Sequence, residues 1–258
     1  MRLDVWLTEH GIYKSRTRAA GAVKSGCVSL DGKTIVRPSY ELDETDASRL
    51  VCLPDPLEYV GRGALKLEYA LERFGIDVAG MTCVDLGAST GGFTQVLLKR
   101  GAASVTAVDV GHGQLDSTLR DDPRVTTVEG CDARAFTPPE GQKFDFLCMD
   151  LSFISIRKLR DKVAELLAPG GCAVVLFKPQ FEVGRGAVGK GGIVRDAARA
   201  QAAMFETTSE YESAGLVLRG QCESPVKGGD GNTEYLLYFR AGAVRAADDT
   251  CKTAPDMR

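Results

Sequence analysis

The sequence predicts an α/β protein: a seven-stranded, largely parallel sheet covered by helices on both faces, preceded by a small α+β domain. Apolar strand-like runs alternate with helical patterns over about 180 residues, as is typical of parallel sheets. The first 53 residues lack this alternation and contain two short helical patterns and a hairpin signal. Pro54-Asp55-Pro56 forms a stiff hinge between the two parts.

These features divide the chain into four segments. We expect an N-terminal domain at 1–53, a linker at 54–60, a larger domain at 61–242 and a disordered tail at 243–258. The tail is polar and has no hydrophobic periodicity, so it offers no apolar face to bury.

Two helices and a hairpin are predicted in the N-terminal domain. The first helix begins at about Arg2, carries apolar residues on one face and ends at Gly11. Ser15 can cap a second helix over 16–25, whose basic residues face solvent. The segment 26–33 predicts a strand that ends in an Asp31-Gly32 turn.

In the larger domain strands and helices alternate. Strands are predicted at 82–86, 104–109, 125–129, 144–149, 172–177, 216–223 and 234–239. Helices are predicted at 64–74, 92–100, 113–120, 155–168 and 196–214. The run from Leu166 to Gly171 contains Pro-Gly-Gly and predicts a firm helix stop.

A glycine loop follows the first of these strands and opens into a helix. Such a loop lets a ligand approach the backbone and the free N–H groups of the helix. A nicotinamide site would prefer G-x-G-x-x-G, whereas here the spacing is Gly87-x-x-x-Gly91-Gly92 with Asp85 in the strand end. The loop therefore resembles motif I of the S-adenosylmethionine (SAM) methyltransferases, in a Rossmann-like sheet. The candidate cofactor residues of this segment are Asp85, Gly87, Ala88, Ser89, Thr90, Gly91, Gly92 and Phe93.

Two further acids follow in order. Asp109 ends the next strand, about twenty residues downstream, where an acid binds ribose hydroxyls in both cofactor families. Asp132 ends the third strand, where methyltransferases often place an Asp against the adenine amino group. These acids favour SAM over a dinucleotide.

Composition excludes several other classes of protein. The 258 residues carry a formal charge of −3, so basic character is only local: six basic residues and one acid lie between Lys14 and Arg37. Only His10 and His112 are present, so neither a histidine triad nor a metal site is expected. The eight cysteines form no C-x-x-C pair, and we find no signal peptide or membrane-length apolar run. We therefore expect free thiols and a cytoplasmic location.

Four charged residues converge at the carboxyl ends of the strands, where ligands bind in open α/β sheets. Asp150 and Lys178 follow the fourth and fifth strands, Glu234 begins the last, antiparallel edge strand, and Lys66 opens the first helix of the larger domain. Two lysines and two carboxylates make a neutral set that can be buried. An ordinary salt-bridge cluster is the alternative.

The order Lys66, Asp150, Lys178, Glu234 resembles the K-D-K-E tetrad of FtsJ-type RNA 2′-O-methyltransferases. The flanks Asp150-Leu151-Ser152-Phe153, Lys178-Pro179-Gln180-Phe181 and Gly231-Asn232-Thr233-Glu234 resemble its TlyA subgroup, an rRNA methyltransferase/haemolysin family. Gly229 departs from this family, which often has proline there. The first 53 residues resemble the S4 RNA-binding domain through R-L-D-x-x-L, S-R-x-x-A and G-x-V-x-x-x-G patterns.

The resemblance implies SAM-dependent methylation of a cytidine ribose in ribosomal RNA, with ribosomal subunits as partners. The short N-terminus resembles members acting on the large subunit, although the small subunit stays open. Lys178 would contact the 2′-hydroxyl, either as a neutral base or as a charged group that orients the oxygen. The expected RNA contacts are Arg2, Lys14, Arg16, Arg18, Lys24, Arg62, Arg185 and Lys190. The last two lie in a basic, glycine-rich loop over 178–195, interpreted as a flexible lid.

Two other functions compete with this one. The family's double name suggests a membrane-active haemolysin, but no long amphipathic helix supports a pore. A non-catalytic RNA-binding assembly factor could have kept the fold, but it would have no need of the four charged residues.

Overall fold

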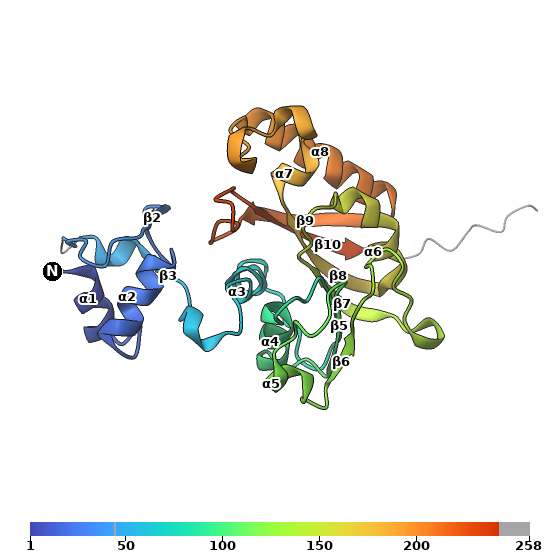
Figure 1. The fold of residues 1–258 in the computed structure, drawn as a ribbon, viewed down its shortest axis with the longest axis horizontal. Helices are drawn as coiled ribbons and strands as arrows, with labels where there is room; N and C mark the ends of the chain where they lie inside the picture. Colours follow the sequence, from blue (N-terminus) through green and yellow to red (C-terminus); the bar gives the residue numbers. More distant parts are fainter. Residues whose placement is uncertain (44, 243–258) are drawn as a thin grey trace, which may run out of the picture.

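The computed structural model describes residues 1–43 and 45–242, and the tail predicted at 243–258 lies outside the described residues. Figure 1 shows a small N-terminal part with its own sheet, joined by an extended segment to a larger part built on a seven-stranded sheet. The predicted α/β fold class is confirmed.

The N-terminal part packs two helices on three short strands. Their bounds are α1 (Leu3–Glu9), α2 (Arg16–Lys24), β1 (Val28–Leu30), β2 (Lys33–Ile35) and β3 (Leu50–Cys52). The side chain of Ser15 accepts a hydrogen bond from the Arg18 N–H, which confirms the predicted cap. Asp31 and Gly32 have φ angles of 49° and 75° and form the turn between β1 and β2. The strand β3 was not predicted; it pairs with β1 from the other side.

The larger part contributes a buried residue, Leu65, to the N-terminal core. Leu3 and Leu7 of α1 are fully buried in that core, together with Leu65. Leu65 lies in α3 (Ala64–Phe74), the first helix of the larger part. The two parts therefore share apolar packing across the linker.

The larger sheet has the strand order β6-β5-β4-β7-β8-β10-β9. Its strands are β4 (Thr82–Leu86), β5 (Ser104–Val108), β6 (Val125–Val128), β7 (Phe144–Met149), β8 (Leu167–Phe177), β9 (Leu216–Glu223) and β10 (Tyr235–Ala241). The strands β4 to β8 pair in parallel, whereas β10 runs antiparallel to both β8 and β9. Consequently the start of β10 lies at the same edge as the ends of β7 and β8.

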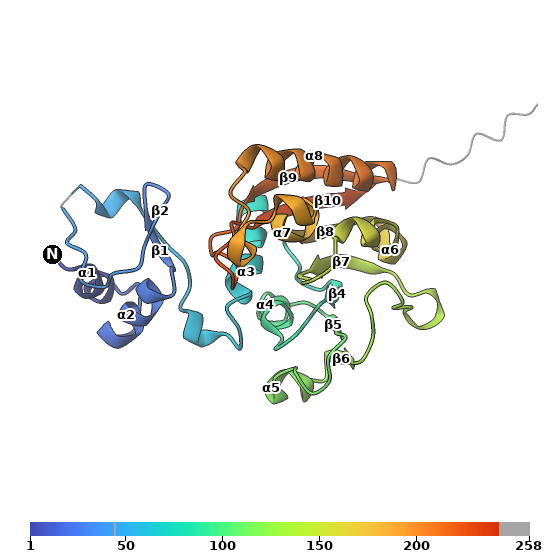
Figure 2. The same ribbon diagram turned by 45° about the horizontal axis from the view of Figure 1, so that its top comes forward.

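Helices cover both faces of this sheet. They are α3, α4 (Gly92–Lys99), α5 (Ser117–Arg120), α6 (Arg160–Leu166), α7 (Pro179–Glu182) and α8 (Ala197–Ser213). The helices α3, α4 and α5 pack into one apolar cluster with the sheet, and α6 and α8 pack into another. In both ribbon views the β9–β10 connection reaches from the sheet toward the N-terminal part (Figure 2).

The structure corrects several predicted boundaries. The helix expected at 113–120 contains only α5, which begins after the capping side chain of Asp116. The helix expected at 155–168 is a 3-10 turn over Ile156–Leu159 followed by α6, and β8 begins at Leu167 rather than at Cys172. The predicted helix stop is confirmed, but the chain continues directly as a strand. The last strand in sequence, β10, lies inside the sheet, and β9 forms the edge.

The predicted lid segment contains short ordered elements. It includes α7 and 3-10 turns at Arg185–Ala187 and Lys190–Gly192. The buried amide of Asn232 accepts a hydrogen bond from the Val194 N–H and donates one to the Gly192 carbonyl. The segment is thereby tied to the loop that precedes β10.

Two sequence expectations concern cysteines and membranes. The seven cysteines within the described residues are free thiols, and four of them are buried. Among residues 1–43 and 45–242, no helix is both long enough and apolar enough to cross a membrane.

Candidate active site

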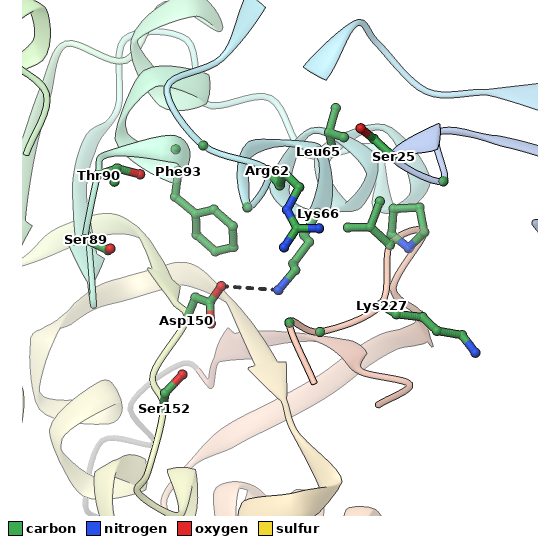
Figure 3. A pocket seen from close by; sticks show the side chains of 18 of the residues that line it. Ser25, Arg62, Leu65, Lys66, Ser89, Thr90, Phe93, Asp150, Ser152 and Lys227 are labelled. Atoms are coloured by element: carbon green, nitrogen blue, oxygen red, sulfur yellow. Dashed lines mark ion pairs between the residues drawn. The ribbon is translucent and has the colours of Figure 1, made fainter. Parts of the chain in front are cut away.

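Four charged side chains that are distant in sequence meet at the carboxyl edge of the sheet. The Nζ of Lys66 lies 2.7 Å from Glu234 Oε2 and 3.5 Å from Asp150 Oδ2. The Nζ of Lys178 lies 2.6 Å from Asp150 Oδ1. Asp150 therefore bridges the two lysines, and Figure 3 shows its ion pair with Lys66.

This tetrad is largely removed from solvent. Lys66 and Lys178 are each 8% exposed, and Glu234 is 2% exposed. Burial of a single charge would be costly, but here two ammonium groups face two carboxylates at short distances. The arrangement predicted from strand ends is therefore present, with each lysine paired to at least one carboxylate.

Two residues around the tetrad were not predicted. Ser152 lies three residues beyond the end of β7 and accepts a hydrogen bond of 2.9 Å from Lys178 Nζ. Gly228 lies against Glu234: a Cβ added there would be 2.4 Å from Glu234 Oε1. A glycine at this position lets the loop before β10 pass close to the buried carboxylate.

The glycine loop contacts the tetrad directly. Gly87 has a φ of 89°, and a Cβ added there would lie 2.5 Å from the carbonyl oxygen of Asp150. Gly91 precedes α4 with a φ of 96°, and an added Cβ would lie 2.4 Å from a methyl carbon of Leu119. Both positions need a residue without a Cβ, because both the backbone angle and the available space exclude larger residues.

Asp85 lies beneath this loop and is fully buried. Its Oδ2 accepts a 2.7 Å hydrogen bond from the hydroxyl of Thr94, whereas no partner for Oδ1 is found among the described residues. Burial raises the pKa of Asp85 to about 7. Asp85 therefore connects the end of β4 to α4 and lines neither of the two large cavities.

One cavity of about 740 Å³ lies over the ends of β4, β5 and β7. Asp109 lines it and holds two loops, since its carboxylate accepts hydrogen bonds from the N–H groups of Ser89 and Gly111 at 2.8 and 2.7 Å. Asp132 also lines it and is paired with Arg134, whose hydrogen bonds lower the pKa of Asp132 to about 2. The two acids predicted to bind a nucleoside thus share one cavity.

A second cavity of about 640 Å³ lies on the other side of the glycine loop, between the N-terminal and larger parts. Both cavities are lined by Gly87, Ser89, Asp150 and Ser152. The carboxylate of Asp150 therefore lies where the two cavities meet. Such a junction can bring two bound reactants together beside Lys178, which lines the second cavity.

An exposed aromatic pair borders the first cavity and was not predicted. Phe153 is 92% exposed with a φ of 66°, a backbone conformation that is strained for a bulky residue. Its ring lies 5.5 Å from that of Phe181, between centroids. The buried Glu182 holds the loop that follows Phe153, because it accepts hydrogen bonds from Ser155 Oγ and the Ile156 N–H.

Most predicted RNA-binding side chains in the N-terminal part form ion pairs within the protein. Arg2 and Arg16 both pair with the buried Asp4, whose pKa these hydrogen bonds lower to about 2. Arg18 pairs with the buried Asp55, and Lys14 with Glu58. Lys24 and Arg62 are exposed and line the second cavity.

Comparisons with known proteins match both parts of the chain. Residues 59–241 match the FtsJ-like methyltransferase family, and residues 1–48 match the S4 domain. The chain is 42% identical, over 95% of its length and 91% of the relative, to the 16S/23S rRNA (cytidine-2′-O)-methyltransferase TlyA of Mycobacterium tuberculosis. It is 41% identical to the putative rRNA methyltransferase YqxC of Bacillus subtilis, over 92% and 85% of the two chains.

A solved structure covers nearly the same extent. A putative hemolysin from Streptococcus thermophilus is 37% identical and superimposes with a TM-score of 0.70, over 94% of this chain and 88% of that one.

Proposed function

Because the chain belongs to the FtsJ-like methyltransferase family and carries an S4 domain at its N-terminus, we propose that it is a SAM-dependent 2′-O-methyltransferase of cytidine in ribosomal RNA. The observation that carries this proposal is the charged tetrad, three of whose four members are buried, at the junction of two cavities. The substrate is the one named for the relative from Mycobacterium tuberculosis. The expected target is the large-subunit RNA, alone or together with the small-subunit RNA, within ribosomal subunits in the cytoplasm.

The first cavity has the size and the hydrogen-bond acceptors that a nucleoside cofactor needs. About 740 Å³ lies within the range of small-molecule sites. The carboxylates of Asp109 and Asp132 can accept hydrogen bonds from ribose hydroxyls and an adenine amino group. The glycine loop Gly87 to Gly92 offers backbone without side chains beside them. These residues would hold SAM, which supplies an electrophilic methyl group when bound.

The second cavity would receive the ribose. An ammonium group carries three N–H donors, and Lys178 directs two of them to Asp150 and Ser152. The third is available to the 2′-oxygen, where it would orient a lone pair toward the cofactor side and stabilise charge that develops on the oxygen. The hydroxyl proton would leave to water as the bond to the methyl group forms, because the methylated, protonated oxygen is strongly acidic and Lys178 is already protonated. Asp150 would fix Lys178, while Lys66 and Glu234 complete the charge balance behind it.

The S4 domain would provide the first contacts with RNA. We assign it to residues 1–53, with the linker at 54–60 and the methyltransferase domain at 61–242. Phosphate contacts fix the orientation of a protein on a nucleic acid without reading its sequence. The proposed contact residues remain Arg2, Lys14, Arg16, Arg18, Lys24, Arg62, Arg185 and Lys190.

Methyl transfer by a lysine variant tests this function. We expect purified protein to move labelled methyl groups from SAM to ribosomal RNA in subunits, and Lys178→Ala to abolish transfer while SAM binding survives. Lys143→Gln is the matched control, because Lys143 precedes β7 at the opposite end of the sheet. Equal turnover by Lys178→Ala would contradict the assigned mechanism.

The haemolysin name of some relatives defines the other arm of the test. Leakage of liposomes by the wild-type protein and equally by Lys178→Ala, without methyl transfer by either, would favour a membrane activity over the proposed one.

A further inference from the structure

The cavity between the two domains has walls from both of them. The N-terminal domain contributes Lys24, Ser25, Gly26, Thr34 and Val36. The opposite wall contains Arg62, the glycine loop, three members of the tetrad (Lys66, Asp150 and Lys178) and the loop Pro225 to Gly229 that precedes β10. A ligand in this space would therefore contact both domains at once.

The charge of this cavity is strongly one-sided. Five cationic side chains line it, but only one carboxylate, Asp150, does so. Lys66 and Lys178 are neutralised by the tetrad carboxylates. The remaining cations, Lys24, Arg62 and Lys227, form no ion pair with any residue in the described part of the chain and are exposed.

This distribution differs from that on the outer surface of the S4 domain. There Arg2, Arg16, Arg18 and Lys14 are committed to carboxylates of the protein itself. A phosphate would have to displace those carboxylates, whereas Lys24 and Lys227 would exchange only water and counterions. Release of condensed counterions favours binding of a nucleic acid to such free cations.

Figure 3 shows the side chain of Lys227 extending away from Asp150. Lys24 comes from the last turn of α2, in the other domain. Arg62 adjoins α3, the helix that carries Lys66, whereas the exposed Lys24 and Lys227 come from two other segments of the cavity wall. They could contact an RNA strand from both domains.

We propose that Lys24 and Lys227 form an interdomain phosphate clamp that holds the RNA strand flanking the target nucleotide. The inference rests on the proposed function for the identity of the ligand. It adds that the acceptor strand enters between the two domains and is contacted from both sides, rather than lying on the S4 helices alone. Lys227 becomes an RNA-binding residue contributed by the methyltransferase domain.

The test measures RNA binding and transfer in full-length Lys24→Gln, Lys227→Gln and the double variant, with Lys143→Gln as control. Binding to ribosomal RNA is measured over a range of salt concentrations in the presence of S-adenosylhomocysteine. Each clamp variant is expected to lower the slope of log affinity against log salt by about 1, and the double variant by about 2. The KM for RNA should rise several-fold, with SAM affinity unchanged.

Two outcomes separate this proposal from the proposed function. Salt slopes equal to that of Lys143→Gln, in a protein that still methylates RNA, would overturn the clamp alone. Absence of methyl transfer by the wild-type protein would overturn the proposed function, whatever the slopes.

Discussion

The ion pair between Lys66 and Glu234 allows the structural and catalytic roles of the tetrad to be separated. At 2.7 Å and an effective dielectric constant of about 20, the attraction between the two charges is about 6 kcal/mol. Desolvation of both groups offsets much of this, and removal of one partner from a buried pair typically costs about 3 kcal/mol or more. We therefore expect Glu234→Gln and Lys66→Met each to lower the free energy of unfolding by about 3 kcal/mol.

The double variant is expected to recover most of that stability. Lys66→Met with Glu234→Gln leaves no uncompensated charge between these positions, and replacing both members of a buried pair is often nearly neutral. Urea denaturation of the four proteins gives the coupling energy, and methyl transfer is measured on the same samples. If both residues support catalysis, the recovered double variant stays at least about tenfold less active than wild type, a loss of roughly 1.4 kcal/mol in transition-state stabilisation.

Two results would refute this reasoning. Additive losses in the double variant would mean that the two side chains do not stabilise each other. Full stability combined with wild-type transfer would mean that Lys66 and Glu234 form only a structural pair.

Two further predictions concern the loop before β10 and the residue beneath the glycine loop. Gly228→Ala should sharply reduce methyl transfer, because its Cβ would lie 2.4 Å from Glu234 Oε1. Gly229→Ala should leave transfer unchanged, because no neighbouring atom lies within 4 Å of its added Cβ. Equal transfer activities of the two variants would contradict the contact between Gly228 and Glu234. Asp85 holds its proton up to about pH 7 when folded but loses it near its ordinary value of 3.8 when unfolded. Stability from this group therefore falls as pH rises from about 4 to 7, and Asp85→Asn should flatten the dependence of Tm on pH over that range. An unchanged slope of Tm against pH, measured by calorimetry, would argue against a buried Asp85 carboxyl with a raised pKa.

The main features of the site follow from sequence because topology fixes them. Residues directly after parallel strands meet at one edge whatever the details of packing, so Asp150 and Lys178 could be placed together with Asp85 and the glycine loop nearby. Glu234 could be added because its strand runs in the opposite direction. The contacts of Ser152 and Gly228 could not be predicted, since they depend on how two loops approach each other in space.

Local patterns also failed where tertiary contacts decide the outcome. The run Leu167 to Gly171 breaks a helix, yet it is included in β8, because Leu167 pairs with Phe144 of β7 and the register then shifts before Cys172 pairs with Phe146. The strand β3 has only three residues and is defined by pairing with β1, far away in sequence. The basic residues of the S4 helices were predicted to face solvent and RNA. The sequence does not reveal that Arg16 forms an ion pair with Asp4, or that Arg18 forms one with Asp55.

The position of Leu65 beside Lys66 has a mechanical consequence. Leu65 is 1% exposed in the core of the N-terminal domain, and the next residue of the same helix reaches the tetrad. Consecutive residues of α3 are thus anchored in two different domains. Any movement of the N-terminal domain relative to the sheet would therefore act on α3 through Leu65, one residue from the ammonium group that pairs with Glu234 and Asp150.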